Sequence, residues 1–150
     1  MKYVTQNGRT VYGGGGIMPD YFVSLDTTLN SHYLNELYVS NAINEYTFDY
    51  ADKNREALEK MVWEKFYNQF EVTDQMLNEL VAAGKRAKVK PDYQELKERK
   101  HIFQIHVKAQ IARKIWGNDG FFPIFNETNE IFLQAIKLFD NMPELSRQKM

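Results

Sequence analysis

The chain has 150 residues, of which 43% are apolar and 26% are charged, a mixture typical of one folded domain with a sizeable core. The 20 Asp and Glu nearly balance the 19 Lys and Arg, so the net charge of -1 disfavours a globally basic nucleic-acid-binding protein. Without cysteine the chain has no disulfides, thiolate metal ligands or cysteine nucleophiles, and no apolar run approaches the roughly 20 residues that a membrane span needs.

Residues 1–26 form a glycine-rich segment with short β-prone stretches, and five of the eight glycines lie in it. Asn7-Gly8, between the stretches Tyr3–Thr5 and Thr10–Tyr12, predicts a hairpin turn, and Tyr21–Val23 is a third β-prone stretch. An isolated two-stranded ribbon is only marginally stable in water. We therefore expect residues 1–25 to be disordered in isolation or to pair with another chain, including a second copy by swapping.

From about Asp26 the apolar residues recur at helical spacing, which predicts a helical domain over residues 27–150. Thr73 is suited to the N-cap of one helix, with Gly84 as its stop or weak point. A later helix, with Pro91 in its first turn, is apolar on two sides and should lie centrally. The expected helices are a long one over roughly 30–56, a short one around Trp63–Phe70, one from Thr73, one from Pro91 to Gly117–Gly120, and a last one over about 127–140. The predicted fold is mainly α, a helical array of about four to five helices with a short N-terminal β segment.

Charge is unevenly distributed along the chain. Residues 20–84 carry a net charge of -8, whereas residues 85–114 carry a net charge of +7. An acidic helix packed beside a basic one, or two solvated faces, explains this pattern most simply. The alternative is an interaction module that uses the basic 85–114 helix to bind an acidic partner. The aromatic residues lie at core spacing, so we expect no nucleic-acid partner.

The four consecutive glycines Gly13–Gly16 invite comparison with a phosphate-binding loop. No Lys-Ser or Lys-Thr follows them, so the side chains that contact phosphate and magnesium are missing. Pro19 also biases the residue before it toward extended geometry. These glycines are more consistent with positive φ angles or with close approach to another segment.

Metal and nucleophile motifs are weak. His101 and His106 are five residues apart, so they lie on different faces of a helix, and no histidine pair has zinc-binding spacing. Glu127 and Glu130 fit a helix N-terminus better than a metal site. The serines lack a nucleophile elbow, and Ser31 is suited to a helix cap. We expect no metal, no cofactor and no catalytic residue in this chain. A small-ligand site among the ten Phe and nine Tyr remains an alternative, and a cavity with convergent Tyr hydroxyls would support it.

The segment from Lys2 to Val23 resembles the end of the catalytic domain in C-terminal processing (tail-specific) serine peptidases, in the branch found in Bacteroidetes-type bacteria. The remaining chain resembles, more weakly, the helical tail of that branch at Asn54-Arg55 and Lys108–Gly117. The motif residues that carry over do so only in a structural role: Gly8, Arg9, Gly15, Gly16, Ile17, Pro19 and Asp20.

The resemblance implies a Ser nucleophile activated by a Lys general base, with a PDZ-type domain that presents the substrate's C-terminal carboxylate. In the family these motifs lie upstream of the Gly-Arg segment, so neither catalytic residue is expected among these 150 residues. The parent is then a periplasmic or cell-envelope endopeptidase. The expected role of this chain is a non-catalytic helical domain that packs on the protease core, regulates it or mediates self-association.

Overall fold

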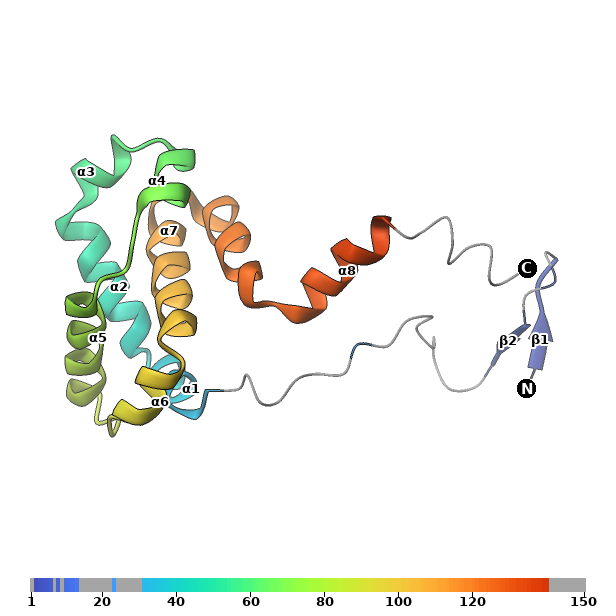
Figure 1. Cartoon of the computed structure of the whole chain (residues 1–150), viewed down its shortest axis with the longest axis horizontal. Coiled ribbons are helices and arrows are strands. Elements are labelled where there is room, and N and C mark those ends of the chain that lie inside the picture. The colour runs from blue at the N-terminus through green and yellow to red at the C-terminus, as the bar shows by residue number, and fades with distance from the viewer. Residues whose placement is uncertain (1, 7, 9, 14–22, 24–30, 141–150) are drawn as a thin grey trace. The chain divides into compact units, whose positions relative to one another are not determined.

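A computed structural model of the chain describes residues 2–6, 8, 10–13, 23 and 31–140 (Figure 1). The described residues are mainly helical, which confirms the predicted fold class. They hold more helices than expected: α1 (His32–Val39), α2 (Ala42–Lys53), α3 (Arg55–Glu59), α4 (Trp63–Gln69), α5 (Asp74–Arg86), α6 (Tyr93–Glu98), α7 (Lys100–Phe125) and α8 (Glu130–Asp140). The chain divides into two units, residues 26–129 and residues 1–25 with 130–150. We call the described part of the first unit, residues 31–129, the helical array.

The N-terminal hairpin forms where the sequence predicts it. Strands β1 (Lys2–Val4) and β2 (Thr10–Tyr12) pair antiparallel, with Tyr3 opposite Val11. Gly8 has a φ of 79° and its N–H donates to Thr5 O at 2.9 Å, so this glycine supplies the positive φ that the turn requires. Gly14 to Gly16 and the third β-prone stretch, apart from Val23, lie outside the described residues.

The expected long helix over 30–56 is wrong, because the chain breaks it twice. Asn41 adopts the left-handed conformation with a φ of 64°, which ends α1 and starts α2. Asn is one of the few residues other than glycine that tolerates this geometry. A second interruption at Asn54 separates α2 from α3. The apolar stripe continues across both breaks, so periodicity alone did not reveal them.

Helix α5 begins as predicted but does not stop at Gly84. The Thr73 hydroxyl accepts the N–H of Met76 at 3.3 Å, which confirms the N-cap. Gly84 lies inside the helix and is buried against α1, where an added Cβ would come within 2.6 Å of Leu37 Cδ2. The glycine therefore permits close packing of two helices, and the helix runs on to Arg86.

The helix expected from Pro91 is interrupted at two positions. Pro91 precedes the N-cap Asp92, whose carboxylate accepts the N–H of Glu95 at 2.8 Å, so it lies just before the helix rather than in its first turn. Arg99 then separates α6 from α7. Gly117 leaves helical geometry with a φ of 65°, as expected, but helical structure resumes after it and extends to Phe125.

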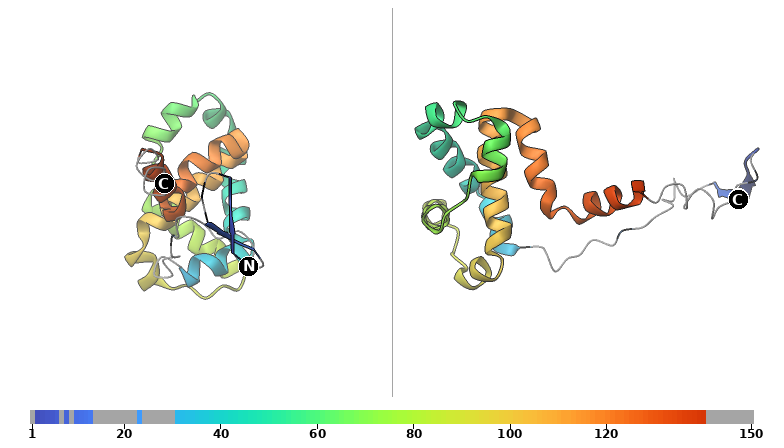
Figure 2. Two further views of the ribbon diagram at one scale, coloured as in Figure 1. Left: turned by 90° about the vertical axis from the view of Figure 1, so that its right-hand side faces the viewer. Right: turned by 45° about the horizontal axis from the view of Figure 1, so that its top comes forward.

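Helix α7 lies at the centre of the helical array, as its two apolar stripes predict. It contacts α2, α3, α4 and α6, and α5 packs on α2. In the right-hand view of Figure 2, α5 is seen nearly end-on while the first part of α7 lies closer to the plane, so their axes cross steeply. Buried residues from both stripes of α7 include Phe103, Ile105, Val107, Ala109, Ile111 and Ala112.

Candidate functional site

Of the motif residues that carry the peptidase resemblance, only Gly8 is described by the structure. It is exposed, has open space around its Cα, and serves the hairpin turn. The other motif residues lie outside the described part of the chain: Arg9, Gly15, Gly16, Ile17, Pro19 and Asp20.

The described serines are used at helix ends. Ser31 Oγ accepts the N–H of Leu34 at 2.9 Å, which confirms the predicted cap of α1. Ser40 Oγ donates to Leu37 O at 3.3 Å. These hydroxyls contribute to helix termini rather than to a catalytic arrangement.

His106 takes part in a polar cluster that links α1 to α7. Tyr38 Oη lies 2.9 Å from His106 Nδ1, and the Gln110 side-chain amide donates to the same hydroxyl at 3.4 Å. Burial lowers the pKa of His106 to about 4, so the ring is neutral at pH 7. The aromatic ring of Phe125 packs edge-on against the imidazole.

This cluster was not predicted from the sequence, because Tyr38 and His106 are 68 residues apart. His32 and His101 are exposed. No group of three or more His, Asp and Glu side chains suited to a metal ion occurs among the described residues. Glu127 is engaged by the hydroxyl of Tyr67, an interaction that raises the pKa of that tyrosine.

The ten basic residues of 85–114 do not share one face of the array. Lys108 turns toward α4, where its ammonium donates to Tyr67 O at 2.7 Å and lies 5.9 Å from the ring centre of Phe66. Lys114 lines a separate hollow beside α2, together with Phe48 and Asp49. The remaining cations lie on α5, in the connection from α5 to α6, on α6, at the start of α7, or beside Phe121 in the case of Arg113.

A hollow between α2 and α5 tests the expectation of convergent tyrosine hydroxyls. It measures about 200 Å³ and is lined by Tyr46 and Tyr50. The Tyr46 hydroxyl donates to Glu79 Oε2 at 3.2 Å, and burial together with the nearby Glu79 carboxylate raises its pKa. This hydroxyl is therefore already engaged within the protein.

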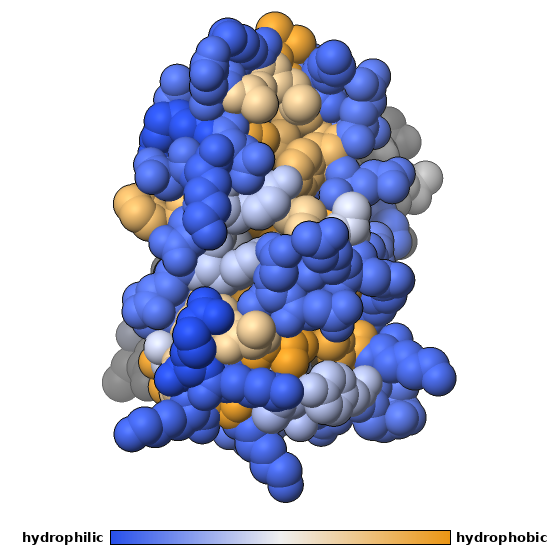
Figure 3. Space-filling model, turned by 90° about the vertical axis from the view of Figure 1, so that its left-hand side faces the viewer, coloured by the Kyte–Doolittle hydropathy of each residue, from blue (hydrophilic) through white to orange (hydrophobic). Residues whose placement is uncertain are grey.

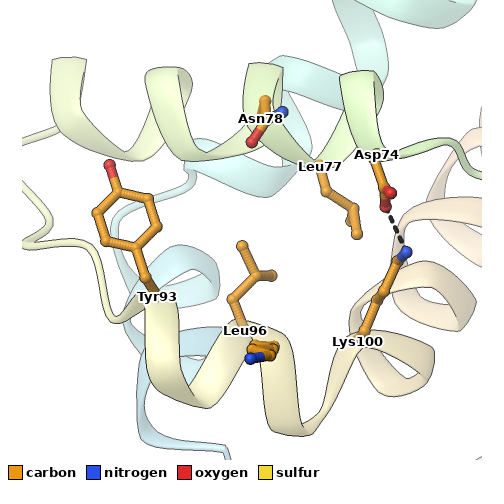
Figure 4. Close-up of a pocket in the computed structure, with 7 residues that line it drawn as sticks. Asp74, Leu77, Asn78, Tyr93, Leu96 and Lys100 are labelled. Carbon is orange, nitrogen blue, oxygen red and sulfur yellow. Dashed lines mark ion pairs between the residues drawn. The ribbon is translucent and has the colours of Figure 1, made fainter.

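A second hollow lies between α5 and the helices α6 and α7, and we call it the α5–α6 groove (Figure 4). It measures about 300 Å³. Leu77 and Leu96 meet at its centre, the ring of Tyr93 stands at one end, and an ion pair between Asp74 and Lys100 closes the other. Asn78 and Lys97 complete the lining. On the face formed by α2, α3 and α5, apolar atoms likewise show mainly in recesses between polar helices (Figure 3).

Helix α8, described by itself, carries exposed apolar side chains. Ile131, Leu133, Ile136 and Phe139 are all exposed, and Phe139 reaches 71%. Phe132 is exposed as well, and five large exposed apolar residues on an eleven-residue helix are unusual for a surface that faces only water.

None of the helices in the described residues is both long enough and apolar enough to cross a membrane. A family model described as a family of unknown function (DUF8443) matches residues 33–117. The match begins in the first turn of α1 and ends at the glycine that interrupts α7, so it spans most of the helical array. Neither a curated protein nor a solved structure matches the chain.

Proposed function

The chain belongs to the DUF8443 family of unknown function, and we propose that it is the non-catalytic helical domain at the C-terminal end of a C-terminal processing serine endopeptidase. The parent is proposed to act in the periplasm or cell envelope through a Ser/Lys dyad located outside these 150 residues. The helical array packs on the protease core in this proposal. The resemblance of residues 2–23 lies outside the family match, so the two similarities concern different parts of the chain.

The observation that carries the proposal is the size and exposure of the hairpin. Its two strands have three residues each, and Val4 is 65% exposed. Among the described residues the sheet has two strands, and a ribbon this short is only marginally stable by itself in water. Both properties support a hairpin that belongs to a larger sheet, such as the end of a catalytic domain.

The exposed face of α8 supports the same proposal. Phe132, Ile136 and Phe139 lie at spacings of four and three residues, so one side of the helix presents a nearly continuous apolar surface. Burying such a surface against another protein part contributes roughly 25 cal/mol per Å². In the proposal this surface is covered by the protease core.

The test compares two polypeptides from the same gene. One is the 150-residue chain, and the other extends the reading frame upstream of Met1. Both are incubated with a peptide that ends in an apolar residue and a free carboxylate, and cleavage is followed by mass spectrometry. We expect the extended polypeptide to cleave the peptide and the 150-residue chain not to cleave it. Replacement of the upstream nucleophilic Ser by Ala should abolish cleavage by the extended polypeptide. An in-frame stop codon immediately before Met1, or cleavage by the 150-residue chain, would contradict the proposal.

A further inference from the structure

We propose that the α5–α6 groove binds a peptide segment of another protein in which an apolar side chain is flanked by carboxylates. This inference is independent of the peptidase proposal, since it concerns only residues inside the helical array. It also narrows the sequence-based alternative of an acidic partner for the 85–114 helix. The binding surface is a small groove rather than a whole helix.

The centre of the groove suits one anchoring apolar side chain. Leu77 is buried, Leu96 is half-buried, and their side chains converge between the two helices (Figure 4). Tyr93, at 59% exposure, offers the face of its ring at the open end. A volume of about 300 Å³ is at the lower limit for ligand clefts, so the groove admits a side chain or two but no large cofactor.

The local acidic residues are already engaged by the protein. Asp92 caps α6, and Glu95 accepts the N–H of Tyr33 at 2.9 Å. Glu98 accepts from the side-chain amide of Gln94. Each of these carboxylates thus accepts a hydrogen bond within the chain, although Asp92 and Glu98 remain exposed, and Asp74 in the groove lining is paired with Lys100.

The lysines in and beside the groove, Lys85, Lys97 and Lys100, are exposed. Lys97 lines the groove, is exposed, and has no ion-pair partner among the residues that the structure describes. The ammonium of Lys85 lies 5.7 Å from the ring centre of Tyr93, beside the open end. A partner that places carboxylates on both sides of its apolar anchor meets one cation at each position. Charge complementarity of this kind favours an acidic segment over a neutral or basic one.

The ion pair between Asp74 and Lys100 limits the groove at its other end. Asp74 repels carboxylates that extend beyond this point, whereas Lys100 retains donors for an acceptor on the groove side. The arrangement thus favours a short segment centred on one anchor. A long acidic chain running through the groove is disfavoured.

The probe is a fluorescein-labelled peptide, Ser-Asp-Glu-Leu-Phe-Asp-Glu-Ser, titrated with the whole chain and followed by fluorescence anisotropy. One comparison peptide replaces the acidic residues by Asn and Gln, and another replaces Leu-Phe by Ser-Ser. The variants are Lys97→Glu, which reverses the groove charge, and Tyr93→Ala, which removes the exposed ring. Lys65→Glu on α4 is the matched control, because it makes the same charge change at an exposed lysine away from the groove.

We expect about a tenfold loss of affinity for Lys97→Glu and for Tyr93→Ala, and less than about a twofold loss for Lys65→Glu. Both comparison peptides should bind about tenfold more weakly, and added salt should weaken the acidic peptide most. Circular dichroism verifies that each variant keeps its helices. Equal losses for Lys97→Glu and Lys65→Glu would show a non-specific charge effect and overturn the proposal. A dimer in sedimentation experiments that Lys97→Glu dissociates would identify the occupant as a second copy and overturn it as well.

Discussion

The carboxylate of Glu95 in α6 accepts the backbone N–H of Tyr33 in α1 at 2.9 Å, across 62 residues of sequence. The first N–H groups of a helix lack partners within the helix, so a carboxylate at this position satisfies one of them and favours the helix dipole. The hydroxyl of Ser31, the N-cap residue of the same helix, accepts a second of these groups, the N–H of Leu34. The first helix of the array is therefore capped by two side chains, and one of them depends on the tertiary fold.

Glu95→Ala is expected to lower the free energy of unfolding by about 1–2 kcal/mol, because it leaves the Tyr33 N–H without its acceptor and removes an ion pair with Arg99. Urea denaturation followed by circular dichroism measures the change. Glu98→Ala, in the same helix but exposed, is the control and should change stability by less than about 0.5 kcal/mol. Equal effects of the two substitutions would contradict the capping role.

Gly84→Ala is expected to destabilise the array although alanine is the better helix former. The new Cβ would lie 2.6 Å from Leu37 Cδ2, and Leu37 is fully buried with little freedom to move. Overpacking of this kind costs about 1–3 kcal/mol, against a gain in helix propensity of about 1 kcal/mol. Ala82→Gly, at an exposed position of the same helix, measures the difference in helix propensity between alanine and glycine without a change in packing. A more stable Gly84→Ala variant would show that the contact between α1 and α5 is not tight.

Stability should decrease on acidification because of His106. Its folded-state pKa is about 4, below the ordinary value of 6.5, so between these values the unfolded chain binds more protons than the folded one. The contribution of the neutral His106 ring to the free energy of unfolding is complete above about pH 6.5 and is lost progressively as the pH falls toward 4. The shift corresponds to at most about 3 kcal/mol. Urea titrations at several pH values measure it.

His106→Gln should flatten the pH dependence between 4 and 6.5, whereas His101→Gln should leave it unchanged, since His101 is exposed. Tyr38→Phe should lower stability by about 1 kcal/mol at pH 7, because the hydrogen bond between the Tyr38 hydroxyl and His106 Nδ1 is lost. An unchanged pH profile in His106→Gln would assign the acid sensitivity to other groups.

The exposed face of α8 should bind a hydrophobic dye. The double variant Ile136→Ser and Phe139→Ser is expected to reduce fluorescence of the dye anilinonaphthalene sulfonate on the 150-residue chain. Thermal unfolding of the array should be unaffected, because the buried core consists of residues between Tyr33 and Ile124. The substitutions Val39→Ser and Phe48→Ser, at isolated exposed apolar positions, provide the control. Equal dye binding by both double variants would argue against a distinct docking face.

Local signals in the sequence predicted much of the fold. Thr73 and Ser31 are caps whose partners lie three residues away, and the two stripes of α7 report burial on both sides. The breaks at Asn41 and Arg99 were missed because the apolar periodicity continues through them. Gly84 was interpreted as the stop or weak point of its helix, since a glycine required for close packing has the same local pattern as one that ends a helix.

The candidate sites were less predictable, because they depend on distant residues. Lys97 and Leu77 meet only when α6 folds against α5, and no motif links them. The same holds for Tyr38 and His106, which join two helices. The charge pattern singled out residues 85–114 but did not show which of their cations are engaged internally. Lys108, half-buried against aromatic rings, and Lys97, exposed in the groove, look alike in the sequence.

The proposed membership of a larger sheet is tested most directly by hydrogen exchange at the hairpin. In an antiparallel pair, only part of the amides of each strand point to the partner, so the outer amides of Lys2–Val4 and Thr10–Tyr12 need further strands for protection. Exchange is compared between the 150-residue chain and the polypeptide extended upstream of Met1. The account predicts fast exchange in the chain alone and at least about hundredfold slower exchange in the extended polypeptide. Equal exchange rates in both would contradict it.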